Sequence, residues 1–309
     1  MKTGFAAALE RERPLIIDGG LSTQLEAQGC DISNALWSAS LLLDEPRAIV
    51  AASRAFLDAG AECIATVSYQ ASREGFAKRD LSTDEADRLM ELSVELALQA
   101  RDGFLGAHPD TALTPLIAGS IGPYGAVRHD GSEYHGHYGV SAEVLQEFHA
   151  ARLRLFDASA TDVLACETIP SMLEARVLAE LLAACDSPSW VSFSCPDARH
   201  ISDGTPVEDA AALFRDHPKV LAVGLNCTPP QYAAELVGRF RDAVPDKTII
   251  VYPNSGETWV AETGEWTGTA SPIDFAQAAS TWVAAGAGIV GGCCRTTPAH
   301  IVAIVRALC

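Results

Sequence analysis

The end of the sequence carries a group of residues suited to metal chemistry. Cys293 and Cys294 are adjacent and follow an apolar run and two glycines, Gly291 and Gly292, while Cys227 ends another apolar run. Successive side chains of a regular strand point to opposite faces, so neighbouring cysteines reach one ion only where a strand ends. We expect the two glycines to free the backbone there, because glycine adopts φ values that other residues avoid.

Three thiolates and an open fourth position predict a catalytic zinc site, because structural zinc has four protein ligands. The alternative is that these residues are small buried hydrophobes, as free cysteine often is. We interpret the remaining cysteines in that structural way: Cys30, Cys63, Cys166, Cys185, Cys195 and Cys309. Nine cysteines without paired short spacings are not typical of a secreted disulfide scaffold and favour a reducing compartment.

Composition excludes some classes of partner. A net charge of −18 argues against a broad basic surface for nucleic acid or anionic lipid. The N-terminal apolar run is too short for a signal peptide, and the weakly charged stretch 278–294 is broken at Gly286, which indicates a helix end and a strand rather than a membrane span. We therefore expect a cytoplasmic protein whose partners are small molecules, with no nucleic acid and no membrane.

The alternation of short apolar runs with amphipathic stretches predicts the strands and helices that would hold these cysteines in place. Near-continuous apolar runs are typical of parallel strands covered on both faces, and we expect strands at 15–18, 63–68, 116–121, 163–167, 190–195, 222–227, 249–253 and 288–292. Pro46 and Gly60 bound one intervening helix, and Ser82 with Glu85 forms a capping box at the start of another. Eight strands each followed by a helix predict one domain over 1–309, a (β/α)8 TIM barrel, with a doubly wound open sheet as the alternative.

Barrel enzymes carry their active sites where the strands end. The residues at or just after the predicted strand ends are Asp18, Ser68, Glu167, Cys227, Asn254, Cys293 and Cys294. The sixth and eighth strands are near neighbours around the ring, so the barrel brings the three cysteines within reach of one another. Two long connections, 122–140 and 254–271, also leave this rim.

Several segments together resemble the homocysteine S-methyltransferase family, most closely its S-methylmethionine:homocysteine branch. They are DGGLSTQLEAQGCD, SYQAS, GSIGPYGA, DGSEYHGHY, LACETIP, SDGTP, GLNC, VYPNSGE and GGCCRTTPAHI, and the resemblance spans about 11–308. It implies a zinc-bearing barrel that methylates the sulfur of homocysteine to give methionine. The implied donor is a sulfonium compound, S-methylmethionine or S-adenosylmethionine, and no separate cobalamin module is expected.

The resemblance also implies roles for individual residues. Cys227, Cys293 and Cys294 would bind Zn²⁺, with the homocysteine sulfur in the open position, where coordination deprotonates a thiol whose ordinary pKa is about 8.5. Glu167 would bind the homocysteine amino group. Asp18, Gly19 and Gly20 would lie beside substrate, and Asn254 would shape the pocket. Independently of the resemblance, Asn226 precedes Cys227 and either supports the metal ligands or caps the helix or turn that follows.

Thr168 departs from the betaine branch of the family, which carries an aromatic residue at this position, and this argues against betaine as donor. Tyr134 and Tyr138 lie in the long 122–140 connection and either close over a sulfonium through cation–π contacts or face solvent. We interpret the His135 and His137 pair as an ordinary loop feature. Alternative functions are a zinc hydrolase, a zinc- or thiol-binding sensor, and a methyltransferase for another thiol or selenol.

Overall fold

The computed structural model describes residues 4–32, 37–128, 130–260, 265–267 and 271–309. Eight parallel strands form one sheet in the order β1-β10-β7-β6-β5-β4-β3-β2. These strands are β1 (Leu15–Ile16), β2 (Cys63–Ala65), β3 (Leu116–Ile121), β4 (Val163–Ile169), β5 (Ser189–Phe193), β6 (Val220–Asn226), β7 (Thr248–Tyr252) and β10 (Ala287–Val290). A parallel bridge between Ile17 and Cys63 joins the two outer strands. The ring therefore closes, which confirms the barrel and excludes the open sheet.

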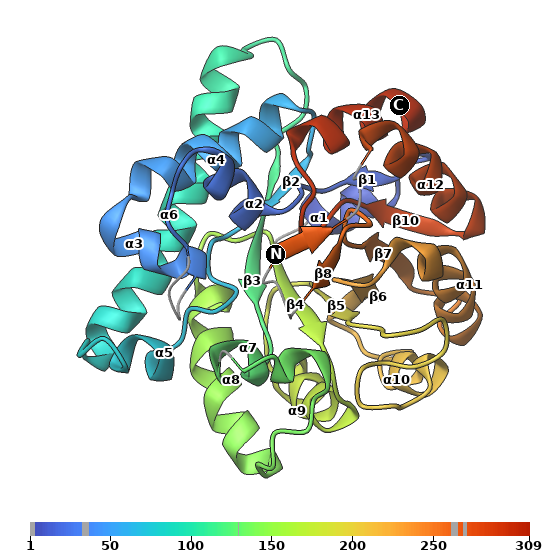
Figure 1. Cartoon of the computed structure of the whole chain (residues 1–309). Helices are drawn as coiled ribbons and strands as arrows, with labels where there is room; N and C mark the ends of the chain where they lie inside the picture. The colour runs from blue at the N-terminus through green and yellow to red at the C-terminus, as the bar shows by residue number, and fades with distance from the viewer. Residues whose placement is uncertain (1–3, 33–36, 129, 261–264, 268–270) are drawn as a thin grey trace.

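Helices surround the ring, as Figure 1 shows in a view along the barrel. The main ones are α2 (Leu21–Ala27), α4 (Pro46–Asp58), α6 (Thr83–Ala107), α8 (Ala142–Ala158), α9 (Met172–Ala183), α10 (Val207–Ala212), α11 (Ala233–Ala243), α12 (Pro272–Ala285) and α13 (Pro298–Leu308). Shorter elements are α1 (Gly4–Leu9), η1 (Trp37–Ser40), α3 (Leu41–Asp44), α5 (Arg73–Ala77), α7 (Tyr124–Arg128), η2 (Ser132–Tyr134) and η3 (Pro230–Tyr232). A small antiparallel hairpin, β8 (Thr258–Val260) and β9 (Glu265–Thr267), lies in the last long connection.

The helix boundaries agree with the signals in the sequence. Pro46 occupies the first turn of α4, and Ser82 and Glu85 form the predicted capping box of α6. Gly286 ends α12 with φ of 120°, and β10 follows directly. The stretch 278–294 is therefore a helix end and a strand, as predicted. Among the described residues, no helix has the length and apolar character needed to cross a membrane.

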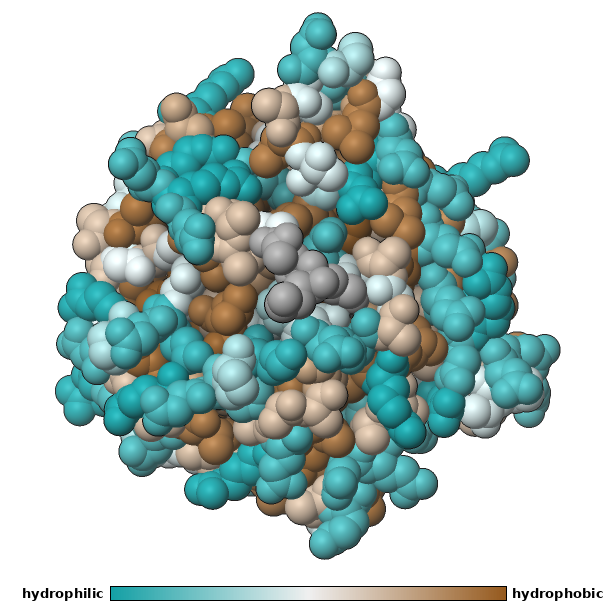
Figure 2. All heavy atoms as spheres, turned by 180° about the vertical axis from the view of Figure 1, so that it is seen from behind, coloured by the Kyte–Doolittle hydropathy of each residue, from teal (hydrophilic) through white to brown (hydrophobic). Residues whose placement is uncertain are grey.

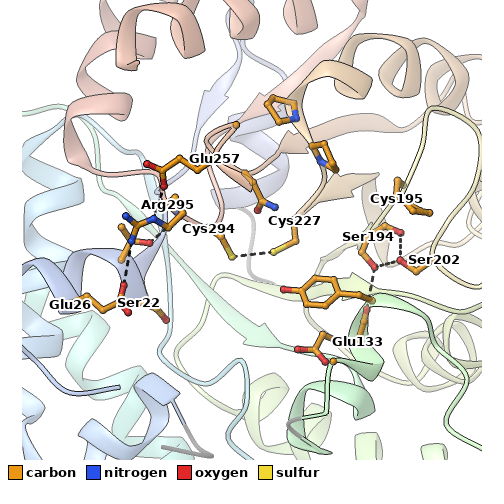
Figure 3. A pocket seen from close by; sticks show the side chains of 18 of the residues that line it. Ser22, Glu26, Glu133, Ser194, Cys195, Ser202, Cys227, Glu257, Cys294 and Arg295 are labelled. Carbon is orange, nitrogen blue, oxygen red and sulfur yellow. Dashed lines mark hydrogen bonds and ion pairs between the residues drawn. The ribbon is translucent and has the colours of Figure 1, made fainter. Parts of the chain in front are cut away.

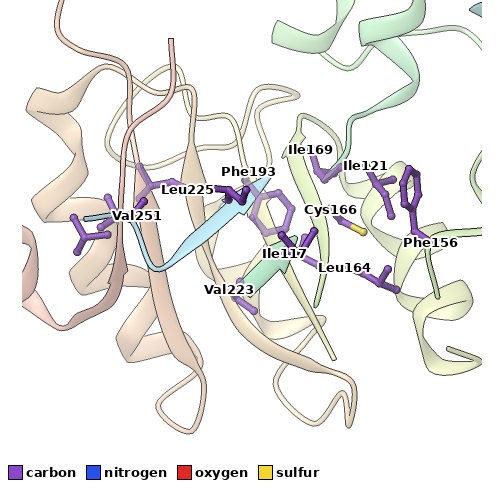
Figure 4. Packing of buried hydrophobic residues seen from close by; sticks show 14 of the residues in the cluster. Ile117, Ile121, Phe156, Leu164, Cys166, Ile169, Phe193, Val223, Leu225 and Val251 are labelled. Carbon is purple, nitrogen blue, oxygen red and sulfur yellow. The ribbon is translucent and has the colours of Figure 1, made fainter. Parts of the chain in front are cut away.

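The strand side chains divide between two hydrophobic cores. Leu164 and Cys166 of β4 point outward and pack with the covering helices, including Phe156 of α8 (Figure 4). Val163 and Ala165 point inward and belong to the barrel interior. This division is the period-2 alternation of a strand, and it explains why both faces of each strand are apolar.

Helix α1 contributes to the interior core. Its Phe5 is fully buried and lies 5.8 Å from the Trp190 ring, measured between centroids. Over the outer surface, by contrast, polar side chains predominate and hydrophobic ones are interspersed, as Figure 2 shows for one face. All nine cysteines are free thiols, and those predicted to be structural are buried except Cys309, which is exposed.

Candidate metal centre and substrate pocket

Three cysteine sulfurs converge at the ends of β6 and β10. Cys227 Sγ lies 2.9 Å from Cys293 Sγ and 3.5 Å from Cys294 Sγ. All three sulfurs lie within 4.8 Å of one another, and this is the one such cluster of possible metal ligands in the described part of the chain. The predicted convergence of residues from two distant strands is thus present in the structure.

The backbone achieves this convergence differently from the expectation based on Gly291 and Gly292. Neither glycine has a positive φ, whereas Cys227 itself has φ of 48° and Arg295 has φ of 64°. The glycines serve close packing instead. A Cβ on Gly291 would lie 2.3 Å from an Ile17 carbon, and one on Gly292 would lie 2.3 Å from Thr296 Oγ1. Non-glycine residues in the left-handed region are strained, and such strain is often found at functional sites.

Backbone hydrogen bonds hold the cysteine loop against the neighbouring strand ends. Cys293 N donates to Pro253 O at 2.8 Å, and Ser255 N donates to Cys294 O at 3.0 Å. Asn254 N donates to Thr228 O at 3.1 Å, which ties the loop after β7 to the loop after β6. The sulfurs are therefore carried by interlocked loops on a rigid barrel.

The donor set fits a soft transition metal. Thiolates select ions such as zinc or copper(I) over magnesium or calcium, which prefer oxygen. Sulfurs around a tetrahedral zinc ion, with bonds near 2.3 Å, lie about 3.8 Å apart. The sulfurs of Cys227 and Cys293, which lie 2.9 Å apart, would therefore move apart by about 0.9 Å when the ion binds. The neighbouring thiols of Cys227 and Cys293 also lower the pKa of Cys294 well below its usual range, so the cluster readily holds a thiolate.

Asn226 connects the cysteine cluster to the end of β4. Its Oδ1 accepts hydrogen bonds from Thr168 N at 2.7 Å and Ser192 Oγ at 2.8 Å. Its Nδ2 donates to Thr168 Oγ1 at 2.7 Å and lies 3.9 Å from Cys293 Sγ. The buried Asn226 therefore lies beside Cys293, and its role as a support for a metal ligand stays a prediction.

Glu167 lies on the same rim, beside the cysteines. Ser120 Oγ donates to Glu167 Oε1, and Tyr252 Oη donates to Oε2 at 3.1 Å. Burial is the main cause that raises the pKa of Glu167 to about 7, and the nearby Cys293 adds to it. No ion pair neutralises Glu167 within the described ranges, so the site can accept a cation.

The segment that follows β1 contacts the loop that carries the cysteine pair; it contains Asp18, Gly19 and Gly20. Asp18 Oδ2 accepts a hydrogen bond from Ala65 N at 2.8 Å, and burial raises the pKa of Asp18 to about 8. Gly20 N donates to Thr296 O and Thr296 Oγ1, and a Cβ on Gly20 would lie 2.7 Å from Cys293 O. These contacts show a structural role for the segment; contact with substrate stays a prediction.

A pocket of about 1150 Å³ opens beside the cysteine cluster (Figure 3). Cys227 and Cys294 line it, together with Asn254, whose buried Oδ1 has no hydrogen-bond partner in the described chain. Further lining residues come from the loop around η2 and the loop after β5, among them Glu133, Tyr134, Ser194 and Ser202. The open side of the sulfur cluster thus faces a cavity large enough for a small molecule.

The two tyrosines of the 122–140 connection have different surroundings. Tyr134 lines the pocket, and Cys227 is the first cause that raises the pKa of Tyr134, so its phenol lies near that sulfur. Tyr138 is buried, and its hydroxyl donates to Glu174 Oε2 at 2.8 Å. Tyr134 alone of the two is therefore placed to contact a ligand. His135 and His137 stack at 5.8 Å between centroids and belong to no metal-ligand cluster in the residues described.

Arg295 interacts with carboxylates. Its Nε donates to Glu257 Oε2 at 2.6 Å, and its Nη1 lies 3.6 Å from Glu26 Oε2 (Figure 3). The guanidinium also helps to lower the pKa of Cys294, as the last of its main causes. Its charge is thus shared between the two carboxylates and the thiolate cluster.

Comparison with known proteins agrees with this geometry. A family model described as homocysteine S-methyltransferase matches residues 15–308. The chain belongs to the homocysteine S-methyltransferase family. The resemblance inferred from the sequence motifs is thereby confirmed.

Members of the family match over almost their full length. The homocysteine S-methyltransferase YbgG of Bacillus subtilis is 45% identical, over 93% of this chain and 92% of its own. The homocysteine S-methyltransferase of Escherichia coli is 42% identical, over 96% of each chain. A crystal structure of the homocysteine methyltransferase MmuM from Escherichia coli, in a metallated form, superposes with a TM-score of 0.88 at 40% identity, covering 97% of this chain and 98% of that one.

Sequence reasoning missed two residues of the site. Ser120 lies one residue before the end of β3 and bonds Glu167, and its position near a strand end was a usable signal. Glu133 lies in the DGSEYHGHY segment, directly before Tyr134, and nothing in the segment distinguishes its carboxylate from that of an ordinary polar loop.

Proposed function

We propose that the protein transfers a methyl group from a sulfonium donor to the thiol of homocysteine in a zinc-dependent reaction, and that residues 1–309 act as one catalytic domain. The observation that carries this proposal is the cluster of three cysteine sulfurs, of which Cys227 and Cys294 line a pocket, on the rim that also carries Glu167. S-methylmethionine is the donor that fits the sequence resemblance best, with S-adenosylmethionine as the second candidate.

Zn²⁺ held by Cys227, Cys293 and Cys294 would supply the deprotonation of the substrate thiol at neutral pH. Glu167 would bind the homocysteine ammonium, so that the substrate is held at its amino end as well as at its sulfur. Because Ser120 and Tyr252 hold both oxygens of Glu167, the carboxylate is already oriented before substrate binds. Such preorganisation removes much of the entropic cost of aligning two substrates.

The methyl transfer is a direct displacement. The homocysteine sulfur attacks the methyl carbon of the donor, the bond between that carbon and the donor sulfur breaks, and the electron pair stays on the donor sulfur. A cationic sulfonium thereby becomes a neutral thioether, and charge is cancelled within the pocket. Asn254 lines the pocket, and its unpartnered Oδ1 would accept a hydrogen bond from the substrate. Asp18, Gly19 and Gly20 are not among the residues that line this pocket, and we propose that they contact the substrate from the adjoining end of β1.

The test is methionine formation by reduced, zinc-loaded protein supplied with homocysteine and one donor: S-methylmethionine, S-adenosylmethionine or betaine. We expect turnover with a sulfonium donor and none with betaine. Turnover with betaine alone would overturn the assignment of donor class. Absence of turnover with every donor, from protein shown to hold zinc, would favour another thiol or selenol acceptor or a zinc sensor.

A further inference from the structure

Glu133 is a buried carboxylate with one unpartnered oxygen. It is 6% exposed, and its Oε2 has no hydrogen-bond partner in the part of the chain that the structure describes. No ion pair of the described residues includes it, although it lines the same pocket as Cys227 and Cys294. Burying a carboxylate without a compensating partner is costly, so this side chain is suited to a ligand that brings a positive charge.

The loop holds Glu133 in this position. Gly125 packs so closely that a Cβ on it would lie 2.5 Å from Glu133 N. Ser194 Oγ donates to Glu133 O at 3.4 Å, a contact visible in Figure 3, and Ser132 N donates to Asp130 Oδ1 at 3.0 Å. The backbone on both sides is therefore anchored, and the carboxylate stays in the pocket wall.

The surroundings of Glu133 are aromatic as well as buried. Its charge is among the lesser causes that raise the pKa of Tyr69 and of Tyr138, after burial, so both phenols lie near it. It also adds to the effect of Cys227 on the pKa of Tyr134. Burial raises the pKa of Glu133 itself, and a bound cation would offset that shift. Tyr134 lines the pocket together with Glu133, and an anion beside an aromatic ring is a typical environment for an ammonium or sulfonium group.

Glu133 and Glu167 are separate carboxylates with different supports. Both oxygens of Glu167 accept hydrogen bonds from Ser120 and Tyr252, and Glu167 lies at the end of β4. Glu133 lies on η2, in the wall of the pocket that the cysteine cluster faces. A reaction between two amino acids presents two ammonium groups, and the site offers one carboxylate for each.

We propose that Glu133 binds the α-ammonium group of the methyl donor, which makes the protein selective for sulfonium amino acids over sulfonium compounds that lack an amino group. This proposal rests on the proposed function, in which Glu167 holds the ammonium of homocysteine. The donor is thereby held by its amino end, with its sulfonium directed toward the cysteine cluster.

The first experiment compares two donors with the unaltered, zinc-loaded protein. S-methylmethionine carries the α-amino group, and dimethylsulfoniopropionate has the same dimethylsulfonium and a carboxylate but no amino group. We expect kcat/KM to be about tenfold to a hundredfold higher for S-methylmethionine, the range for one charged hydrogen bond. Equal values for the two donors would overturn the proposal without any variant being made.

The second experiment uses Glu133→Gln. Its KM for S-methylmethionine should rise about tenfold or more, while its KM for homocysteine stays within about twofold and its kcat/KM for dimethylsulfoniopropionate within about threefold. The matched control is Glu26→Gln, because Glu26 lines the same pocket but already faces Arg295, and this variant should keep the KM values of the parent.

Each other outcome contradicts a particular claim. If Glu133→Gln raises only the KM for homocysteine, Glu133 binds the acceptor and the proposal is overturned. If Glu26→Gln raises the KM for S-methylmethionine as much as Glu133→Gln does, the effect is general charge attraction, and the proposal is again overturned. If the parent protein forms no methionine with either donor, the proposed function fails first. If Glu133→Gln does not fold, Glu133→Asp replaces it, and the comparison of donors decides the question independently.

Discussion

Asn226 and Thr168 exchange two hydrogen bonds across the rim of the barrel. Thr168 N donates to Asn226 Oδ1 and Asn226 Nδ2 donates to Thr168 Oγ1, both at 2.7 Å. Thr168 follows Glu167, and Asn226 precedes Cys227, so the pair joins the carboxylate side of the site to the sulfur side. Thr168 and Cys227 both have positive φ, at 61° and 48°. The exchange therefore holds two strained residues in the geometry that the site needs.

Replacement of Asn226 by Ala should affect both stability and metal binding. It leaves Thr168 N and Thr168 Oγ1 buried without this partner, which costs about 2–4 kcal/mol of unfolding free energy. Zinc affinity should fall about tenfold or more, the usual effect of removing a support for a metal ligand. Urea unfolding and zinc titration measure both effects. Ser192→Ala removes one donor to the same Oδ1 and one hydrogen bond with Tyr252 Oη but leaves the pair itself intact, so it should cost less, about 1–2 kcal/mol. Equal losses in the two variants would contradict the special role of the pair.

Replacement of Cys227 by Ala removes one of the three sulfurs, since two thiolates cannot hold zinc as firmly. We expect loss of stoichiometric zinc and of activity with an unchanged far-ultraviolet circular dichroism spectrum. Cys195→Ala is the matched control, because Cys195 lines the same pocket but lies outside the cluster. Atomic emission after dialysis measures the zinc. Stoichiometric zinc in the Cys227 variant would refute the ligand assignment.

The binding of homocysteine should depend on the ionisation of Glu167. Burial raises the pKa of this carboxyl to about 7, and only the ionised form attracts an ammonium. The KM for homocysteine should therefore rise as pH falls below about 7, by about tenfold per pH unit at the limit. The Glu167→Gln variant should have a raised KM that no longer changes between these pH values. If its KM still rises below about pH 7, another group causes the pH dependence.

Asp18 should make stability depend on pH. Its folded-state pKa is raised from 3.8 to about 8 by burial, so the folded chain binds the proton more strongly than the unfolded chain. Stability contributed by the protonated form is present at low pH and is lost as pH rises between these values. Asp18→Asn keeps an acceptor for Ala65 N and carries no charge. Its advantage in unfolding free energy over the parent should grow by up to about 1.4 kcal/mol per pH unit in this window. Parallel stability curves, measured in urea from pH 4 to 8, would contradict the shift.

The sequence was sufficient to predict most of the barrel. The predicted strand 116–121 coincides with β3, and the Pro46 and Ser82 signals mark true helix starts. Such elements are determined locally, by side-chain periodicity and by capping residues. The convergence of Cys227 with Cys293 and Cys294 followed from the fold, because parallel strands bring their ends to one rim.

Other features of the site depend on contacts between loops that the sequence does not reveal. The positive φ of Cys227 results from the loops that surround it, and nothing in its own residue type favours that conformation. Tyr134 and Tyr138 are four residues apart in one motif, yet one faces the pocket and the other bonds Glu174 on a different helix. Tertiary packing decides between such neighbours, so their roles required the structure.

The strained backbone of Thr168, Cys227 and Arg295 gathers on one edge of an otherwise regular barrel. Glycine at Arg295 would relieve the left-handed conformation by about 1–2 kcal/mol, whereas glycine at Thr168 would also remove the hydroxyl that bonds Asn226 Nδ2. The same changes would loosen the segments that carry Glu167 and the cysteine pair. Thermostable variants obtained without selection for turnover should therefore accumulate changes at this edge and turn over more slowly.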